Sequence, residues 1–455
     1  MARCAPRAAS GRRPCRDRRR PRASRAATGS VRVTAFVAAV NRRTFLSLRR
    51  HRNYRLFFTG QVVSVTGTWM QNIATAWLVL ELTHSPVAVG VLALCQFLPF
   101  SVFGLVSGVL VDRFDARRMV IGTQAASLVF AGALAALALG GVVELWEVYV
   151  LTALRGTVLV LDAPARQALT FQMVGRDELP NAVALNSSLF NAARVVGPAF
   201  GGVVVATAGI GWAFAANAGS FLAVLAALLL VRPAELFPVV RAEKTGVLSG
   251  TREAFDYLRR APLAALALMT VLVVSTFSFN FNVLLPVLAQ HTLEGGPQVF
   301  GIISAFFGAG ALLGALLSAS LGRATWKVLL TGTAGFGAAE VFLAPQTSVA
   351  AVAVLLFATG TFFTLWTSNA NAMLQLGAPD ALRGRVVGLY YFAFNGTGPA
   401  GGLLAGWLAS VGGTFLALLV AGGAAVAMSL FALARLRADA QPAGKPRTVA
   451  LAVRR

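Results

Sequence analysis

Apolar runs long enough to cross a bilayer follow one another along this sequence from Leu56 onward. A membrane-spanning helix needs about 20 largely apolar residues, because its backbone polar groups must all be hydrogen-bonded within the helix. Short polar turns separate the runs. We therefore predict an all-α integral membrane protein with twelve transmembrane helices, at residues 56–80, 87–111, 119–140, 146–166, 184–206, 211–231, 263–289, 298–321, 326–344, 349–374, 384–409 and 413–434.

The composition leaves little room for a soluble domain, since 57% of the 455 residues are hydrophobic and only 13% are charged. Much of the net charge of +23 lies in the first part of the chain, where 17 arginines occur in residues 1–55 against one acid, Asp17. We expect residues 1–52 to be a basic, disordered tail. A charge confined to a tail and loops does not predict a nucleic-acid partner.

The twelve predicted spans fall into two groups of six. The longest polar interruption, residues 232–262, separates a first half at 53–231 from a second half at 263–436, and 437–455 form a short tail. We expect this linker to contain a short amphipathic helix. Residues of the first half recur in the second at an offset of 203, as expected for a duplicated transporter: Gln172, Asp177, Leu179 and Val183 match Gln375, Asp380, Leu382 and Val386.

The distribution of lysine and arginine predicts the orientation in the membrane. The connections on one side carry these residues, whereas the six turns on the other side contain none. By the positive-inside rule, both termini and the central linker are cytoplasmic and the protein is a multi-pass protein of the cell (plasma) membrane.

A charged turn between the second and third spans contains Gly108, Asp112, Arg113, Arg117 and Arg118. The pattern resembles the Gly-x3-Asp-Arg-x-Gly-Arg-Arg loop of major facilitator superfamily transporters, with Asp115 and Ala116 departing from it. The resemblance implies two pseudo-symmetric six-helix bundles, the major facilitator fold. It also implies that these five residues form a cytoplasmic latch.

The fifth span contains a second motif, Gly197, Pro198, Gly201 and Gly202. It resembles the Gly-x3-Gly-Pro-x2-Gly-Gly motif of proton-coupled exporters in the superfamily, with Ala193 at the first glycine. Proline kinks a helix and glycines permit close packing, so these four residues form a candidate hinge. The alternative is an ordinary packing kink. The start of the first span, from Asn53 onward, is similar to the subgroup that contains the enterobactin exporter and macrolide-efflux-like proteins.

Polar side chains recur at helical spacing on four otherwise apolar spans, which correspond to the cavity-lining helices of the family that the chain resembles. Each one alone could simply hydrogen-bond its own helix. Together they predict a central cavity. The candidate cavity-lining residues are Gln61, Ser64, Thr68, Asn72, Ser275, Ser278, Asn282, Thr364, Ser368, Asn371 and Gln375.

Charged residues at membrane depth need a partner or water, because each costs about 2.5–3.5 kcal/mol to insert. Arg155 and Arg194 lie about ten residues into their spans, and Asp162 and Arg166 follow Arg155 on one helix face at +7 and +4. Arg155, Asp162, Arg194 and Glu340 are therefore candidates for coupling to an ion, and Arg155 is also a candidate anion-binding charge. Structural pairing of Asp162 with Arg155 or with Arg194 is the alternative for these charges.

These features predict a secondary active transporter, most simply a monomeric, proton-coupled exporter of a small amphipathic molecule such as a drug, siderophore or secondary metabolite. An importer or a lipid flippase of the same fold remains the alternative. We expect no enzyme activity and no cofactor: the three histidines are scattered in the tail and turns, no phosphate-binding Gly-x4-Gly-Lys motif occurs, and three scattered cysteines provide no metal site.

Overall fold

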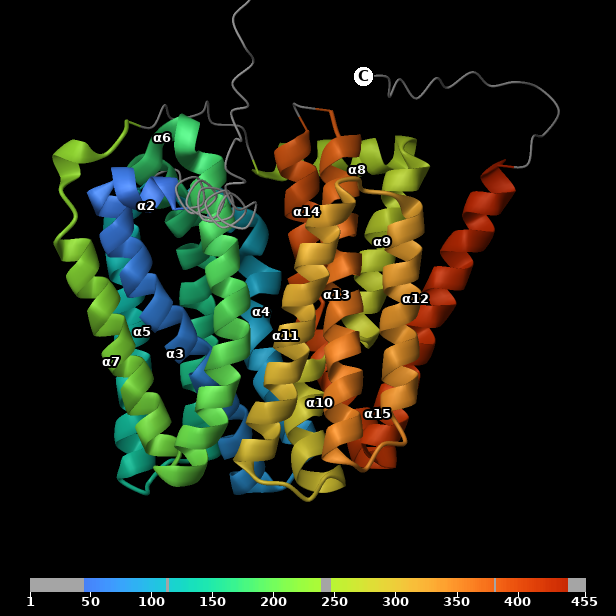
Figure 1. Ribbon diagram of the computed structural model, residues 1–455, viewed down its shortest axis with the longest axis horizontal. Helices are drawn as coiled ribbons and strands as arrows, with labels where there is room; N and C mark the ends of the chain where they lie inside the picture. Colours follow the sequence, from blue (N-terminus) through green and yellow to red (C-terminus); the bar gives the residue numbers. More distant parts are fainter. Residues whose placement is uncertain (1–44, 112–113, 239–246, 380–381, 441–455) are drawn as a thin grey trace, which may run out of the picture. The chain divides into compact units, whose positions relative to one another are not determined.

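The computed structural model describes residues 45–111, 114–238, 247–379 and 382–440. Every helix from α3 onward belongs to one compact unit of the chain (Figure 1). No strand occurs in the described part. The helices are α2 (Leu46–Arg50), α3 (Arg52–Thr83), α4 (Pro86–Val111), α5 (Ala116–Leu139), α6 (Leu145–Thr207), α7 (Ile210–Leu229), η1 (Pro233–Glu235), α8 (Val247–Arg260), α9 (Pro262–Phe277), α10 (Phe281–Val287), η2 (Leu288–Thr292), α11 (Pro297–Leu321), α12 (Trp326–Leu343), α13 (Val349–Gly377), α14 (Arg383–Asn395) and α15 (Gly398–Ala440).

Eight helical segments of the described chain are long and apolar enough to cross a membrane. Two of them each consist of two helices joined at a break: the backbone is non-helical at Gly175 inside α6, and at Gly412 and Gly413 inside α15. Gly175 and Gly413 have positive φ angles of 70° and 66°, a conformation that glycine adopts without steric cost. The all-α membrane fold is thus confirmed. Because α3 and α12 lie outside this set of eight, the count of twelve spans stays a prediction.

The helices pack as two groups. In the first, α3 contacts α6 and α7, and α5 contacts the same two helices. In the second, α13 packs against α11 and α12, while α15 packs against α9 and α12. The groups meet along two helix pairs, α6 with α11 and α4 with α15.

Glycines allow the two groups to approach closely where these pairs meet. A Cβ added at Gly202 of α6 would lie 2.9 Å from the Cα of Gly301 of α11, and one added at Gly90 of α4 would lie 2.7 Å from the carbonyl oxygen of Gly402 of α15. Real Cβ atoms do not tolerate such distances, so larger residues at these positions would push the helices apart.

Local signals in the sequence determine where several helices begin. The Asp115 carboxylate accepts a hydrogen bond from the Arg118 backbone N–H at 2.8 Å and so caps α5. Glu144 and Glu147 form a reciprocal capping box at the start of α6. Pro297 occupies the first turn of α11, where its missing N–H costs no helical hydrogen bond.

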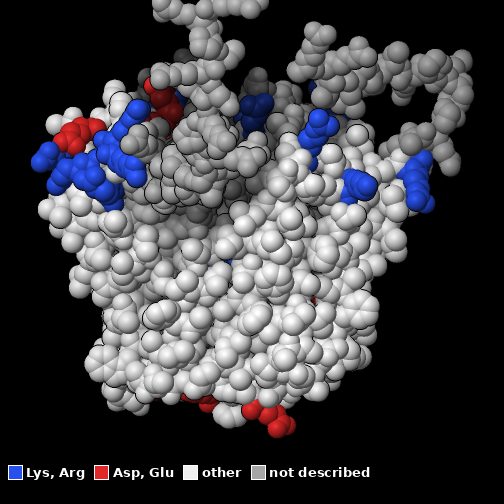
Figure 2. Space-filling model, in the orientation of Figure 1, with Lys and Arg blue, Asp and Glu red and all other residues white. Residues whose placement is uncertain are grey.

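The charged side chains are segregated between the two ends of the helix bundle (Figure 2). Basic side chains gather at the end where α2, α8 and α14 lie, whereas the opposite end shows acidic side chains and no basic ones in this view. The predicted amphipathic helix of the linker is α8, and Glu253 in it forms an ion pair with Arg385 of α14. The side of the membrane that each end faces remains a prediction from the positive-inside rule.

Candidate functional site

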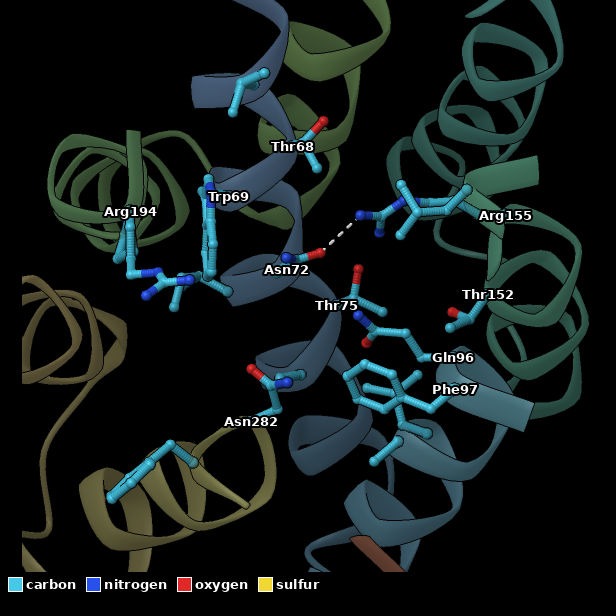
Figure 3. A pocket seen from close by; sticks show the side chains of 18 of the residues that line it. Thr68, Trp69, Asn72, Thr75, Gln96, Phe97, Thr152, Arg155, Arg194 and Asn282 are labelled. Atoms are coloured by element: carbon cyan, nitrogen blue, oxygen red, sulfur yellow. Dashed lines mark hydrogen bonds between the residues drawn. The ribbon is translucent and has the colours of Figure 1, made fainter. Parts of the chain in front are cut away.

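A cavity of about 330 Å³ lies between the two helix groups. The first group lines it with side chains from α3 to α7, and the second with side chains from α10, α11, α14 and Phe279, which lies between α9 and α10 (Figure 3). A smaller cavity of about 190 Å³ shares Arg194, Phe394 and Asn395 with the first. The polar lining of the larger cavity comprises Ser64, Thr68, Asn72, Thr75, Gln96, Gln124, Ser127, Thr152, Arg155, Asp162, Arg166, Arg194, Asn282, Ser304 and Asn395.

The structure places part of the predicted polar stripes at these cavities. Ser64, Thr68 and Asn72 of α3 and Asn282 of α10 line the larger cavity, and Thr364 and Asn371 of α13 line the smaller one. The other predicted lining residues are outside both cavities. They are Gln61, Ser275, Ser278, Ser368 and Gln375.

Several of those remaining residues have structural contacts instead. The Ser278 hydroxyl donates to the carbonyl oxygen of Ala421 at 2.6 Å and ties the end of α9 to α15. The Gln375 side chain donates to the Asn371 Oδ1 at 2.9 Å on its own helix. Ser275 is buried, and its hydroxyl has no hydrogen-bond partner among the described residues.

Arg155 projects from the first part of α6 toward α3. Its Nη2 donates to the Oδ1 of Asn72 at 2.8 Å (Figure 3). No carboxylate pairs with Arg155 in the described part of the chain, so its charge faces the cavity with only a neutral amide against it.

Arg194, in the second part of α6, lies between aromatic rings from both helix groups. Its guanidinium carbon is 5.2 Å from the ring centroid of Trp69 in α3 and 5.8 Å from that of Phe363 in α13. Both distances are within the range of cation–π attraction. Among the described residues, no acidic side chain neutralises Arg194.

Asp162 belongs to a closed polar network between α3, α5 and α6. It is 2% exposed, and its Oδ1 accepts hydrogen bonds from the Thr123 hydroxyl at 2.6 Å and from the Gln124 side chain at 2.9 Å. Its other oxygen forms an ion pair with Arg166, one helical turn away. Arg166 in turn donates to the Gln61 Oε1 at 2.5 Å. Asp162 thus pairs with neither Arg155 nor Arg194, the two structural partners expected from the sequence.

Glu340 is fully buried in α12, outside both cavities. Neither of its carboxylate oxygens has a hydrogen-bond partner among the described residues. An unpartnered carboxylate in an apolar interior is costly, which keeps Glu340 as a candidate for proton binding. Its position gives no direct contact with a substrate in either cavity.

The fifth-span motif lies where α6 meets its neighbours. Gly197 and Gly201 face α3, since an added Cβ at Gly201 would lie 3.2 Å from the Cα of Met70, and Gly202 faces α11 of the other group. Pro198 lies inside α6 and lines the larger cavity. The motif therefore places its glycines at close helix contacts on two sides, one of them between the groups.

The latch motif is described only in part. Asp112 and Arg113 lie outside the described residues, and Gly108 lies in α4, in a stretch whose surroundings are not described. Arg117 donates from its Nη2 and Nε to the Leu228 carbonyl oxygen, at 2.9 and 3.2 Å, near the C-terminal end of α7. Arg118 is exposed. The latch role remains a prediction, and the structure adds a helix-capping contact for Arg117.

Sequence reasoning did not find the aromatic part of the cavity. Trp69 and the phenylalanines Phe279, Phe281, Phe300, Phe307 and Phe394 line it. An aromatic residue in an apolar span looks the same whether it faces lipid or a cavity. For Trp69 alone the sequence held a signal, because the neighbouring polar residues Thr68 and Asn72 on the same helix were predicted to line the cavity.

Comparisons with known proteins show the family. The model of the transmembrane secretion effector family matches residues 44–448. The chain belongs to this family of major facilitator transporters. It is a multi-pass membrane protein that acts on small molecules and is not an enzyme.

Relatives and solved structures agree with this assignment. The chain is 28% identical to the uncharacterised MFS-type transporter YfiS of Bacillus subtilis, over 85% of this chain and 93% of that one. It is 29% identical to the multidrug efflux pump Tap of Mycolicibacterium fortuitum (77% and 88%) and 29% identical to the enterobactin exporter EntS of Escherichia coli (80% and 87%). The nucleoside transporter NupG has the same fold, with a TM-score of 0.68 at 12% identity over 86% of this chain and 99% of that one.

Proposed function

We propose that this protein is a proton-coupled exporter of a small amphipathic molecule, working as a monomer in the cell membrane by alternating access. The observation that carries the proposal is a cavity lined jointly by two helix groups that touch through glycines. Side chains from both groups would contact a substrate there, so that movement of one group against the other changes the side from which it is reached.

The position of the glycine contacts supports a seal on the outer side. Gly202 lies near the end of α6, and Gly406, which contacts Gly90, lies shortly before the break at Gly412 in α15. Gly90 and Gly301 lie near the beginnings of α4 and α11. All are within about two helical turns of the end opposite the basic side chains. By the predicted orientation this is the outer end, so these four glycines would allow the helix groups to close on the outside.

The direction of transport rests on the relatives. Tap is described as an efflux pump and EntS as an exporter, and the staphyloferrin A transporter of Staphylococcus aureus matches over 58% of this chain at 24% identity. Similarity to these proteins, with the fifth-span motif, favours export over the importer and lipid-flippase alternatives.

A comparison of secreted metabolites between a deletion strain and its parent, with drug-sensitivity screening of both, tests export directly. We expect a compound to accumulate inside the deletion strain and return to the medium on complementation. Purified protein in liposomes should then move that compound when a pH gradient is imposed. If the deletion strain instead fails to take up an external compound, the chain is an importer.

A further inference from the structure

The charges of the larger cavity are unevenly distributed. Four charged side chains line it, and all come from α6: Arg155, Asp162, Arg166 and Arg194. Three positive charges and one negative charge leave a net charge of +2 in the described lining. A net positive charge inside a membrane protein is costly unless an anion or water compensates for it.

The single negative charge of the lining, that of Asp162, already has a partner. Asp162 pairs with Arg166 and accepts two further hydrogen bonds from α5, so the charges of Asp162 and Arg166 neutralise each other. The net charge therefore belongs to Arg155 and Arg194. One has a neutral amide as partner and the other has aromatic rings.

Both guanidinium groups retain donors for an anion. Arg155 donates to Asn72 from Nη2, and none of its other N–H groups has a partner in the described part of the chain. Arg194 is held over the Trp69 and Phe363 rings, and a guanidinium stacked on a ring keeps its N–H donors in the plane of the group. In Figure 3 the two arginines lie on either side of Trp69 and Asn72 of α3. Planar guanidinium donors match carboxylate oxygens well.

The wall contributed by the second helix group has the opposite character. It carries no charge among the described lining residues and consists mainly of phenylalanines, with Asn282, Ser304 and Asn395 as its polar members. Phe279 stacks on Phe394 at 5.2 Å between ring centroids, and Phe281 contacts Phe307 at 4.8 Å. Such a surface binds apolar or aromatic rings and offers no charge to pair with an ionised group.

We propose that the substrate is an amphipathic organic anion, whose acidic group is attracted by the net positive charge of Arg155 and Arg194 and whose apolar, preferably aromatic, body packs on the phenylalanine wall. This assignment of substrate class rests on the proposed transport function. The two helix groups recognise different ends of the molecule, so an anion without an apolar body, or an apolar cation, lacks one of the two contacts.

A series of ligands of equal shape tests the proposal. Calorimetric titration of the wild-type protein in nanodiscs would compare naphthoate, naphthamide and naphthylmethylammonium, with acetate as an anion that lacks the ring. Empty nanodiscs provide the correction for partition into lipid. We expect naphthoate to bind at least about tenfold more tightly than the other three, the loss expected for one charge-assisted hydrogen bond. Equal or tighter binding of the ammonium compound would overturn the proposal.

Substitution of the arginines locates the binding site. Arg155→Gln and Arg194→Gln should each weaken naphthoate binding about tenfold or more, while Arg155→Lys should retain part of the affinity because it keeps the charge. Arg176→Gln is the matched control, since Arg176 lies on the same helix, exposed and away from both cavities. Naphthoate binding that is unchanged in both cavity variants would refute the assignment even if all variants fold normally.

Transport measurements separate failure of this inference from failure of the proposed function. If wild-type protein in liposomes binds naphthoate but transports neither naphthoate nor any metabolite that accumulates in the deletion strain, the result supports the substrate class and contradicts export. Active export of the cationic dye ethidium, without selective naphthoate binding, would support export and contradict the anionic substrate class.

Discussion

Replacement of Gly202 by alanine tests whether the glycine contact between α6 and α11 controls the conformational equilibrium. The added Cβ would lie 2.6 Å from the Pro297 carbonyl oxygen and 2.9 Å from the Gly301 Cα, whereas carbon atoms normally pack at about 3.5–4.0 Å. Both neighbours are backbone atoms, so they cannot rotate away. Overpacking of this kind costs about 1–3 kcal/mol. The cost applies only while the helices touch, so it should shift the population away from the closed outer end by about 5- to 150-fold.

Spin labels at the outer turns would measure this shift. Ala208→Cys after α6 and Glu294→Cys before α11 place labels on exposed residues of the two helix groups, in an otherwise cysteine-free background. Double electron–electron resonance should show a longer distance for Gly202→Ala than for the parent. Gly132→Ala is the matched control, because nothing lies within 4 Å of its added Cβ. An unchanged distance distribution in folded Gly202→Ala protein would mean that this contact does not hold the outer end closed.

Three further predictions concern the charged ends of the bundle. Reporter fusions after Glu144 should indicate an external location and fusions after Arg241 a cytoplasmic one, because the connections between spans carry lysine and arginine only on the predicted inner side. An external result at Arg241 would contradict the two-half arrangement. Asp112→Asn should insert and fold but transport poorly in vesicles, since it removes a predicted latch contact, and wild-type transport would make Asp112 an ordinary loop charge. Arg117→Ala should lower the thermal midpoint, because two hydrogen bonds to Leu228 at about 0.5–1.5 kcal/mol each are lost; an unchanged midpoint would refute this.

The pattern of apolar runs was sufficient to predict the helical membrane fold, and glycine explains where the long helices bend. Gly175 lies between the predicted spans 146–166 and 184–206, and Gly413 lies just after the predicted span 384–409, so a break was expected near each. The cavity was predictable only in part. Ser64, Thr68 and Asn72 line it as helical spacing predicts, but Gln61 on the same stripe turns to Arg166.

The partners of buried charges were harder to predict than their positions. Asp162 has Arg155 at seven residues and Arg166 at four on one helix face, and spacing alone does not choose between them. The choice depends on Thr123 and Gln124, which α5 brings to Asp162 and which orient its carboxylate. Contacts between helices distant in sequence, like that of Arg194 with Trp69, have no local signature.

The charge of the substrate determines which gradient can drive its export. With the cell interior negative, outward movement of a monoanion gains about 2.3 kcal/mol per 100 mV, and exchange for one entering proton would double this electrical gain. Arginine cannot release a proton in a protein, so Asp162 is the first candidate to carry it. Protonation of Asp162 would leave the positive charge of Arg166 without a partner and would therefore strengthen anion binding. A proton at Asp162 thus does not displace the anion directly, and exchange of the two must arise from the conformational cycle.

Liposomes loaded with naphthoate can separate the two driving forces. A potassium gradient with valinomycin imposes a potential alone, and a pH jump with the potential clamped imposes a proton gradient alone. We expect both to drive efflux by the wild type, and we expect Asp162→Asn to lose the pH-driven part while it keeps the potential-driven part. Loss of both would mean that Asp162 supports the cavity itself. Equal pH-driven efflux in variant and wild type would exclude Asp162 as the proton carrier. Glu340→Gln would then be the variant expected to abolish pH-driven efflux, since the buried Glu340 carboxylate has no hydrogen-bond partner among the described residues.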